Sequence, residues 1–458
     1  MPRKRHIVVM ELFGSSGVRG IVGASMGPDL VVTIAKAAGT VWDAERAVIG
    51  RDTRPSGQML AAAAASGLAA VGTDVVDVGV TPTPNVVRLA EQWSIPGVVI
   101  TASHNPARFN GVKLVGAAGR ELSVDALERI EACIDHGTAR PVDHTAVGRI
   151  THRVGVNQPY IDAVQQAVDA EAIAAAELHV VIDPGDGAGS LTTPQLFRDL
   201  GCEVTTVNAT TDGTFPARPP EPVPQHLGLL QETVRAADAD LGIAHDGDAD
   251  RAVFVDETGA PIAGEASLAA LAAADLDAGA TMVAAIDSSQ RLVDVVEDAG
   301  ATLELTPIGA SHLITAIERL QAAGASTPIA GEGNGGVFFP PYRVVRDGAY
   351  TAARFAALVA EQPASAVVAP HRGYHTARHN ITVGDERERG RIQARADRYL
   401  RRRGGRITDI DGTRVDLEDG WILVRPSGTE PLVRIVAEAA SAATATAYVE
   451  ETEQAIVP

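Results

Sequence analysis

Short apolar runs alternate with alanine-rich amphipathic stretches along most of the chain, which predicts strands followed by helices. The same order of elements occurs three times: a strand that leads to an aspartate, a helix, a glycine and a second strand. This order predicts parallel pairing within a sheet. The first strands of the three copies span 47–52, 179–183 and 281–286. The helix of the first copy precedes Gly72, that of the second ends at Leu200 and that of the third spans 291–298. The second strands span 74–78, 203–207 and 302–305.

Each copy continues with another helix and a third apolar strand, and a different polar loop follows each third strand. The first loop is Thr101–Pro106, directly after the apolar run 97–100. The second loop lies in Ala244–Arg251 and the third in Ala330–Gly336. Ligands of open α/β sheets bind outside the carboxyl ends of the strands. We therefore expect the three loops to contribute to one composite site.

Four domains are predicted: three related α/β domains with mixed, mostly parallel sheets, and a C-terminal α+β domain. A polar stretch at 141–151 separates the first two copies, a helix at 160–176 begins the second, and strand 252–255 begins the third. The last linker is placed at 361–364, before a charged helix at 389–402 and strands at 414–417, 420–424 and 432–437. The predicted boundaries are 1–150, 151–252, 253–364 and 365–458.

Composition narrows the classes of partner. The net charge of −19 over 458 residues argues against nucleic acid or an anionic membrane as main partners. An acidic surface with three lysines suits a high-salt cytoplasm, although a GC-rich genome would also favour Arg and Ala codons. Cys133 and Cys202 have no metal-site or disulfide-framework spacing, and no apolar run is long enough for a membrane span or signal. We expect a cytoplasmic protein.

The first loop carries Ser103 and His104, with Lys113 nearby. A serine at the end of a strand, close to a cation, could carry a phosphoryl group, but a plain Asx/Ser turn is the alternative. Lys113 is a candidate for proton transfer, because arginine does not give up its proton at working pH. The alternative is an ordinary surface lysine.

The second loop places three carboxylates, Asp246, Asp248 and Asp250, within five residues and is followed by Arg251. Carboxylates this close repel one another unless a cation neutralises them, and hard oxygen ligands suit Mg²⁺. The spacing does not fit an EF-hand. A solvated acidic turn is the alternative.

Three further stretches carry groups that could hold a sugar or a phosphate. Glu332 and Asn334 in the glycine-rich third loop could hydrogen-bond sugar hydroxyls, or form a surface turn. The segment from Arg425 through Ser427, Gly428 and Thr429 could form an anion nest, with Arg434 as a second cation. The glycine-rich stretch ending at Gly20 contains Arg19, which could serve an anion or lie in a turn.

Together these motifs resemble the α-D-phosphohexomutase family along the length of the chain. T-A-S-H-N-P at 101–106 resembles the family's phosphoserine loop, and D-G-D-A-D-R at 246–251 resembles its Mg²⁺ loop. G-E-G-N-G-G at 331–336 resembles the sugar loop, and R-P-S-G-T-E-P at 425–431 resembles the phosphate loop. F-G-S-S-G-V-R-G at 13–20 resembles the N-terminal signature. The resemblance implies four domains around a central cleft. It also implies one Mg²⁺ held by the three aspartates and phosphorylated Ser103, with Arg19 and Arg251 in the site.

The implied activity is interconversion of hexose 6-phosphate and hexose 1-phosphate through phosphoserine 103 and a bisphosphate, with hexose 1,6-bisphosphate as activator. Lys113 and His104 are the candidates for proton transfer and orientation. Asn334 and Gly336 stand where many members have Ser and His. Glucosamine phosphate is the preferred candidate substrate, with glucose or mannose phosphate as the alternative. A Mg²⁺-dependent phosphatase and a non-catalytic sugar-phosphate sensor are rival classes, and we expect a monomer or homodimer.

Overall fold

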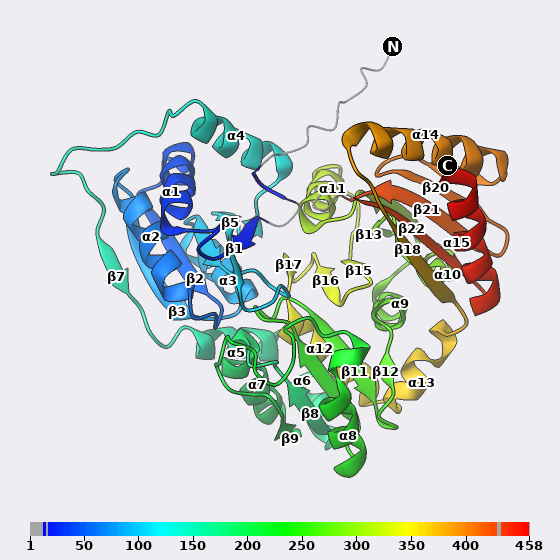
Figure 1. The fold of residues 1–458 in the computed structure, drawn as a ribbon. Helices are drawn as coiled ribbons and strands as arrows, with labels where there is room; N and C mark the ends of the chain where they lie inside the picture. The colour runs from blue at the N-terminus through cyan, green and yellow to red at the C-terminus, as the bar shows by residue number, and fades with distance from the viewer. Residues whose placement is uncertain (1–11, 15–16, 428–431, 458) are drawn as a thin grey trace.

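The computed structural model of the chain describes residues 12–14, 17–427 and 432–457. Four sheet-based units follow one another around the molecule, from the blue and cyan first unit to the orange and red fourth (Figure 1). The first three contain mixed sheets flanked by helices, and the fourth contains an antiparallel sheet. The expected fold class is therefore confirmed.

The first sheet separates two hydrophobic layers. Its strands are β1 (Val18–Ile21), β2 (Arg46–Arg51), β3 (Asp74–Val80), β4 (Gly97–Ile100), β5 (Phe109–Gly116), β6 (Arg120–Glu121) and β7 (Ile150–His152), in the order β1-β5-β4-β2-β3-β7, with β6 paired to β5. Successive side chains of a strand point to opposite faces. One face therefore packs against α1 (Pro28–Trp42), α2 (Gly57–Ala69) and α4 (Val124–Asp135), and the other against α3 (Thr83–Trp93).

The second and third sheets repeat the topology of the first. In each, the first strand lies between two parallel neighbours, and an antiparallel hairpin follows the third strand. The second sheet has β8 (His179–Asp183), β9 (Glu203–Thr206), β10 (Leu241–His245), β11 (Ala252–Asp256) and β12 (Pro261–Ile262). The third has β13 (Thr281–Ala285), β14 (Thr302–Thr306), β15 (Ala330–Glu332), β16 (Gly336–Phe339) and β17 (Arg343–Arg346).

Helices cover these two sheets, and the two domains share one hydrophobic core. Phe254 of β11 stacks on Phe355 at 4.1 Å between ring centroids, which joins the second sheet to a helix of the third domain. The helices are α5 (Asn157–Gln166), α6 (Ala170–Ala175), α7 (Thr193–Asp199), α8 (Gly228–Ala236), α9 (Gly264–Asp275), α10 (Gln290–Asp298), α11 (Ala310–Ala322), α12 (Gly348–Val359) and α13 (Ala364–Val368), with short 3₁₀ turns at Ala188–Leu191, Pro224–His226 and Ala369–His371.

The fourth domain is an antiparallel sheet covered by two helices, as the C-terminal pattern predicted (Figure 1). The sheet packs through Trp421 and Leu423 against Ile286 of the third domain. Its elements are β18 (His375–Thr382), α14 (Glu386–Arg402), β19 (Arg406–Thr408), β20 (Thr413–Leu417), β21 (Gly420–Pro426), β22 (Leu432–Ala439) and α15 (Ala442–Ile456), in the sheet order β18-β22-β21-β20-β19.

Two details of the predicted organisation are wrong. The helix expected at 160–176 is divided into α5 and α6, because the Asp169 side chain accepts a hydrogen bond from the Ala172 amide and caps a new helix. The strand expected to begin the third copy, 252–255, is β11 of the second sheet, where it pairs antiparallel with β10. A short loop after β10 returns the chain as a hairpin, which an apolar run does not distinguish from a new repeat.

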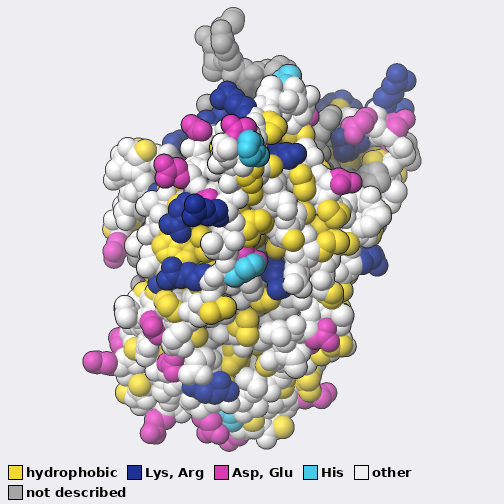
Figure 2. Space-filling view, turned by 90° about the vertical axis from the view of Figure 1, so that its left-hand side faces the viewer, with side chains coloured by type: hydrophobic (Ala, Val, Ile, Leu, Met, Phe, Trp, Pro, Cys, Tyr) yellow, Lys and Arg dark blue, Asp and Glu magenta, His cyan; other side chains and the backbone are white. Residues whose placement is uncertain are grey.

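The outer side of the first domain is not uniformly acidic. Figure 2, which views this side of the molecule, shows hydrophobic side chains mixed with Lys and Arg across the middle of the face and acidic side chains mainly toward its rim. Strand β7 lies at the edge of the first sheet, and Val147, Ile150 and Val154 in and beside it are 46–91% exposed. Among the described helices, none combines the length and apolar character that crossing a bilayer requires.

Candidate active site

Ser103 is held in a strained turn after β4 with its hydroxyl directed at the second domain. Its φ of 51° is a left-handed conformation that non-glycine residues rarely adopt. The Ser103 amide donates to Thr101 Oγ1 at 2.9 Å, and the Ser103 hydroxyl donates to Asp246 Oδ2 at 2.7 Å. The residue is fully buried. The predicted phosphoryl carrier thus touches the first carboxylate of the predicted metal loop.

Arg54 fixes the shape of the Ser103 loop, and sequence analysis did not identify it. Its guanidinium donates to four backbone carbonyls of the loop, those of Ser103, Asn105, Pro106 and Phe109, at 2.6–2.8 Å. Arg54 Nε also pairs with Asp52 at 2.9 Å, and both side chains are fully buried. One cation therefore binds four carbonyls of the loop at once and holds its shape.

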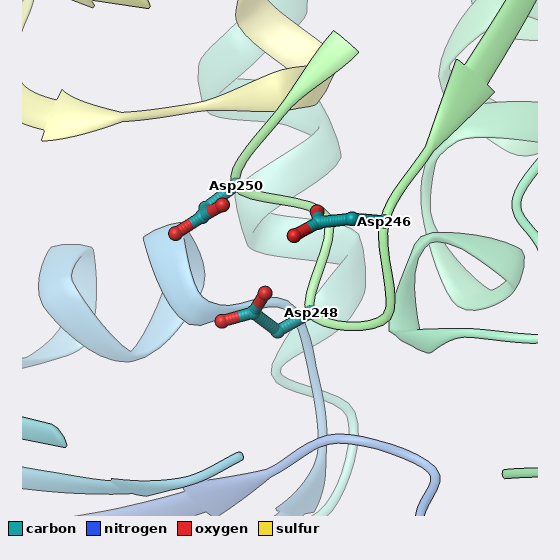
Figure 3. Close-up of side chains that lie close together, drawn as sticks. All are labelled: Asp246, Asp248 and Asp250. Carbon is teal, nitrogen blue, oxygen red and sulfur yellow. The ribbon is translucent and has the colours of Figure 1, made fainter. Parts of the chain in front are cut away.

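The three aspartates of the second loop form a compact acidic group (Figure 3). One oxygen from each of Asp246, Asp248 and Asp250 lies within 4.8 Å of the others, and all three residues are fully buried. The second oxygen, Oδ1, of each carboxylate is buried without a hydrogen bond in the described part of the chain. Burial, followed by Asp250 and Asp248, raises the pKa of Asp246 to about 7. Hard, unsatisfied oxygens in this arrangement fit a divalent cation such as Mg²⁺.

Lys113 and Arg346 supply the positive charge next to the acidic group. Lys113 Nζ donates to Asp248 and Asp250 at 2.8 Å each, and Arg346 Nη2 donates to Asp250 at 2.7 Å. Burial acts to lower the pKa of Lys113, but Asp248 and Asp250 outweigh burial and raise this pKa. Lys113 is therefore a charged donor in this structure, in contact with two of the three carboxylates.

Gly247 allows the first two loops to approach each other. A Cβ atom at this position would lie 2.7 Å from the Ser103 carbonyl oxygen, which is closer than real Cβ atoms come to a neighbour. The first domain also binds the metal loop through Thr83 at the start of α3, whose hydroxyl donates to Asp248 at 2.6 Å. A glycine between two of the aspartates is thus a packing requirement of the composite site.

His104 and Arg19 flank the Ser103 loop. His104 Nδ1 lies 3.4 Å from Ser103 Oγ, and burial, followed by the Arg251 and Arg19 charges, lowers the pKa of His104 to about 2. The imidazole is therefore neutral. Arg19 lies on β1, opposite Gly111 of β5, and donates to Asn105 Oδ1 at 3.0 Å. His104 therefore lies beside the Ser103 hydroxyl, and Arg19 contacts the same loop through Asn105.

The third loop joins the site through Arg346. Glu332 is buried and accepts from Arg346 Nη1 at 3.4 Å, so one guanidinium connects the sugar-loop candidate with Asp250. The Asn334 side chain closes the turn by accepting from the Gly336 amide at 3.0 Å. A Cβ atom at Gly336 would lie 2.7 Å from Arg346 Cδ. Gly336 is therefore coupled to the position of Arg346.

The phosphate-loop candidates lie at the ends of β21 and β22. Arg425 pairs with Asp411 at 2.9 Å and lies opposite Arg434 in the sheet, and buried Ser427 donates its amide to the Leu432 carbonyl at 2.9 Å. Gly428 and Thr429 lie outside the described residues. The Arg425 charge acts on the Asp287 carboxyl of the third domain, which places the fourth domain beside the other loops.

A cavity of about 410 Å³ opens between the second, third and fourth domains. Arg251 lines it, and the Arg251 Nε atom lies 3.9 Å from Asp250 and 4.0 Å from Asp246. The lining includes side chains of both signs and the sugar loop: Glu221, Arg251, Glu265, Asp287, Glu332, Asn334 and Arg378. The cavity therefore adjoins the acidic group and has the size and polarity for a sugar phosphate.

Sequence analysis missed the residues that hold the loops in place. Arg218 does for the metal loop what Arg54 does for the Ser103 loop: it pairs with Asp183 at 3.0 Å and donates to the His245 carbonyl at 2.8 Å. The repeated aspartate after the first strand of each copy, Asp52, Asp183 and Asp287, was the available signal. Arg346 had no comparable pattern around it, because its partners come from distant segments.

Comparison with known proteins agrees with this geometry. Models of the phosphoglucomutase/phosphomannomutase domains match the chain in order: α/β/α domain I at residues 10–141, domain II at 158–259, domain III at 256–372 and the C-terminal domain at 380–455.

Whole-length relatives carry different names, among them phosphoglucomutase/phosphomannomutase, phosphoglucosamine mutase and phosphopentomutase. A phosphoglucomutase/phosphomannomutase of Thermococcus kodakarensis is 40% identical, covering 96% of this chain and 97% of its own. A probable phosphoglucosamine mutase of Methanococcoides burtonii is 37% identical, covering 94% and 95%. The crystal structure of a phosphoglucomutase/phosphomannomutase family protein from Burkholderia thailandensis superimposes with a TM-score of 0.83 at 27% identity, covering 98% of each chain. The chain belongs to the phosphoglucomutase/phosphomannomutase family, the α-D-phosphohexomutases, and is a phosphomutase.

Proposed function

We propose that the protein interconverts hexose 6-phosphate and hexose 1-phosphate through phosphorylated Ser103 and a hexose 1,6-bisphosphate, with glucosamine 6-phosphate as the preferred substrate. The observation that carries the proposal is the 2.7 Å contact between the Ser103 hydroxyl and Asp246 of the acidic group. A phosphoryl group on Ser103 would lie next to the carboxylates that fit Mg²⁺. Glucose or mannose phosphate is the alternative substrate, since relatives carry both names.

Asp246, Asp248 and Asp250 would hold one Mg²⁺, with the Ser103 phosphate as the fourth ligand. When bound, this ion withdraws charge from the transferring phosphoryl group. The unsatisfied oxygens of the three aspartates support this assignment. Gly247 and the Arg54 and Arg218 contacts hold the two loops at their short separation.

In the first transfer, a sugar hydroxyl oxygen bonds to the phosphorus and the bond between phosphorus and Ser103 Oγ breaks. The hydroxyl loses its proton and Ser103 Oγ regains one. In the return transfer the other phosphate of the bisphosphate moves back to Ser103 and the proton movements reverse. Lys113 is charged in this structure and would act first as the proton donor, and neutral His104 would orient the serine.

Arg425, Ser427, Gly428 and Thr429, with Arg434, would grip the phosphate that is not reacting, and Arg19 and Arg251 would contact the one near Ser103. Because the two ends of the bisphosphate exchange places, this grip must accept either end of the sugar. A fixed anion site built on β21 and β22 suits this requirement better than a site specific for one sugar position. Glu332 and Asn334 would bind sugar hydroxyls.

The direct test is turnover of three sugar phosphates by the purified protein. Glucosamine, glucose and mannose 6-phosphates are compared with Mg²⁺ and the corresponding 1,6-bisphosphate, and ³¹P NMR follows the hexose 1-phosphate formed and any free phosphate released. We expect isomerisation, with glucosamine 6-phosphate the best substrate. Release of inorganic phosphate in place of isomerisation would favour the phosphatase, and tight binding without either product would favour the sensor.

The Ser103→Ala variant should abolish turnover, because the phosphoryl carrier is removed, while circular dichroism and the melting temperature remain those of a folded protein. Ser66→Ala, on the exposed face of α2, is the matched control and should retain wild-type activity. Wild-type activity of Ser103→Ala would overturn the assignment. Mass spectrometry of the wild-type peptide that contains Ser103 should find it phosphorylated in part.

A further inference from the structure

One wall of the cavity carries more negative charge than its own cations neutralise. Three carboxylates reach this wall from different elements: Glu265 from the start of α9, Asp287 from the segment after β13 and Glu332 from β15. Within the described residues, Glu332 is the one member with a cation within 3.5 Å, namely Arg346. The nearest cation to Glu265 is the largely exposed Arg378, at 3.9 Å. We call these three residues the carboxylate wall.

Asp287 is the member of the carboxylate wall with the least support from the protein. In the described part of the chain its carboxylate forms neither a hydrogen bond to another side chain nor an ion pair within 4.0 Å. Arg414 lies close but donates to the Ile286 and Ser288 carbonyls, on either side of Asp287, at 2.6 and 2.9 Å. Burial and the neighbouring Glu332 raise the pKa of Asp287 to about 6, against the opposing effect of the Arg425 and Arg378 charges. A half-buried carboxylate that lines the cavity without an ion pair is available to a cationic group of a ligand.

The cavity lining also includes the cation Arg251. Arg251 is only 7% exposed, and its Nε atom has no hydrogen bond within the described residues. It lies beside the acidic group, at the end of the cavity nearest to Ser103. The cavity therefore presents a buried cation whose Nε atom has no hydrogen bond and, among its carboxylates, one without an ion pair within the described residues, so its charge pattern is complementary to a zwitterion.

We propose that the carboxylate wall, through Asp287 and Glu265, binds the ammonium group of an amino sugar phosphate and so selects a hexosamine phosphate over a neutral hexose phosphate. The inference rests on the proposed mutase function and adds the residues that determine its sugar. The amine of such a sugar is charged at neutral pH, as α-amino groups with a pKa of about 8 are. An ammonium group offers the wall both charge and donors, whereas a hydroxyl at the same ring position offers a donor only.

The experiment measures kcat/KM for glucosamine 6-phosphate and glucose 6-phosphate with wild type, Asp287→Asn and the matched control Asp298→Asn. Asp298 lies at the exposed end of the neighbouring helix α10. Asn keeps the size of the side chain and removes its charge. We expect Asp287→Asn to lower kcat/KM for glucosamine 6-phosphate by about 10- to 100-fold and to change the glucose 6-phosphate value much less. Glu265→Gln should shift the ratio in the same direction by a smaller factor.

An unchanged substrate ratio in both Asp287→Asn and Glu265→Gln would overturn the inference, as would a wild type that prefers glucose 6-phosphate. Isothermal titration calorimetry of the two sugar phosphates distinguishes failure of this inference from failure of the proposed mutase function. A wild type that isomerises neither sugar but binds the amino sugar more tightly, with the difference lost in Asp287→Asn, would refute the mutase and retain the wall. Equal binding of both sugars by wild type would refute the wall even if the protein is a mutase.

Discussion

Asp52 of the first repeat and Asp287 of the third occupy corresponding places, just after the first strand of the sheet, and differ in what surrounds them. Asp52 accepts hydrogen bonds from the Arg54 amide, Arg54 Nε and the Thr101 hydroxyl at 2.7–3.0 Å and is fully buried. Asp287 has no such partners among the described residues and lines the cavity. In the first repeat the aspartate belongs to the scaffold, and in the third we propose that it faces the ligand.

The difference shows how corresponding positions of a repeated unit can hold the scaffold in one copy and line the cavity in another. Arg54 sits two residues after Asp52 and binds both the aspartate and the neighbouring loop. In the third repeat the nearby cation, Arg414, comes from the fourth domain, pairs with Asp416 at 2.7 Å and donates to the Ile286 and Ser288 carbonyls. The Asp287 carboxylate is thereby left for another partner. A carboxylate retained in this state lowers stability, as residues of functional sites often do.

The largest effect is expected from breaking the scaffold. Asp52→Asn removes the charge that balances buried Arg54 and should lower the free energy of unfolding by about 3–5 kcal/mol, because a buried cation is left unpaired. Burial raises the pKa of Asp52, but the Arg54 guanidinium at 2.9 Å acts against burial. Denaturant unfolding at pH 8 measures the change, with Asp298→Asn as control. A variant as stable as wild type would show that the pair contributes nothing to the scaffold.

The second repeat sharpens the comparison, because its aspartate–arginine pair supports the acidic group. Mg²⁺ at 100 times its Kd should raise the free energy of unfolding of the wild type by about 2.7 kcal/mol. Arg218→Met removes the donor to the His245 carbonyl, directly before Asp246, and should weaken Mg²⁺ binding by about 10- to 100-fold. Unfolding with and without Mg²⁺ measures both, with Arg198→Met on the exposed side of α7 as control. Equal Mg²⁺ affinity in Arg218→Met would contradict a supporting role.

A smaller effect, on substrate binding, is expected from a change at Arg425. This residue belongs to the fourth domain, and its charge acts on Asp287. Arg425→Ala should raise KM for the sugar phosphate by about 10- to 100-fold through loss of one charge-assisted phosphate contact, with little change in stability. Steady-state kinetics with the preferred substrate measures this change, and Arg391→Ala on the exposed face of α14 is the control. If KM and kcat both remain at wild-type values, Arg425 is not part of the phosphate grip.

Local pattern was sufficient for the architecture and for the loops that carry chemistry. The central strands β4 and β10 are apolar throughout, as strands covered on both faces are, and their polar ends met as expected at Ser103 and Asp246. The repeated order of elements carried this inference, because equivalent strand ends of similar sheets present equivalent loops. The acidic group at 246–250 was likewise predictable, because its three aspartates are close neighbours in the sequence.

The sequence could not predict contacts that only the folded chain creates. Arg346 reaches Asp250 and Glu332 from a strand 96 and 14 residues away, and Arg218 lies in a long segment with no motif around it. Strand β11 was misassigned for a related reason. A strand that pairs antiparallel with the strand before it has the same apolar pattern as a strand that begins a new parallel sheet. Asp287 was visible as a repeated aspartate, but its freedom from an arginine partner is a property of the packed domains.

The most direct test of the division between Asp52 and Asp287 is the stability of Asp287→Asn as a function of pH. The pKa of Asp287 is raised to about 6 in the folded protein from an ordinary value of 3.8. The folded state therefore binds this proton more tightly than the unfolded state does, and wild type loses stability as pH rises from about 4 to 6. Asn lacks this penalty. Asp287→Asn should be more stable than wild type by about 1–3 kcal/mol at pH 8, with the difference vanishing near pH 4, whereas Asp52→Asn is destabilised at pH 8. A loss of stability in Asp287→Asn at pH 8, as in Asp52→Asn, would contradict the account.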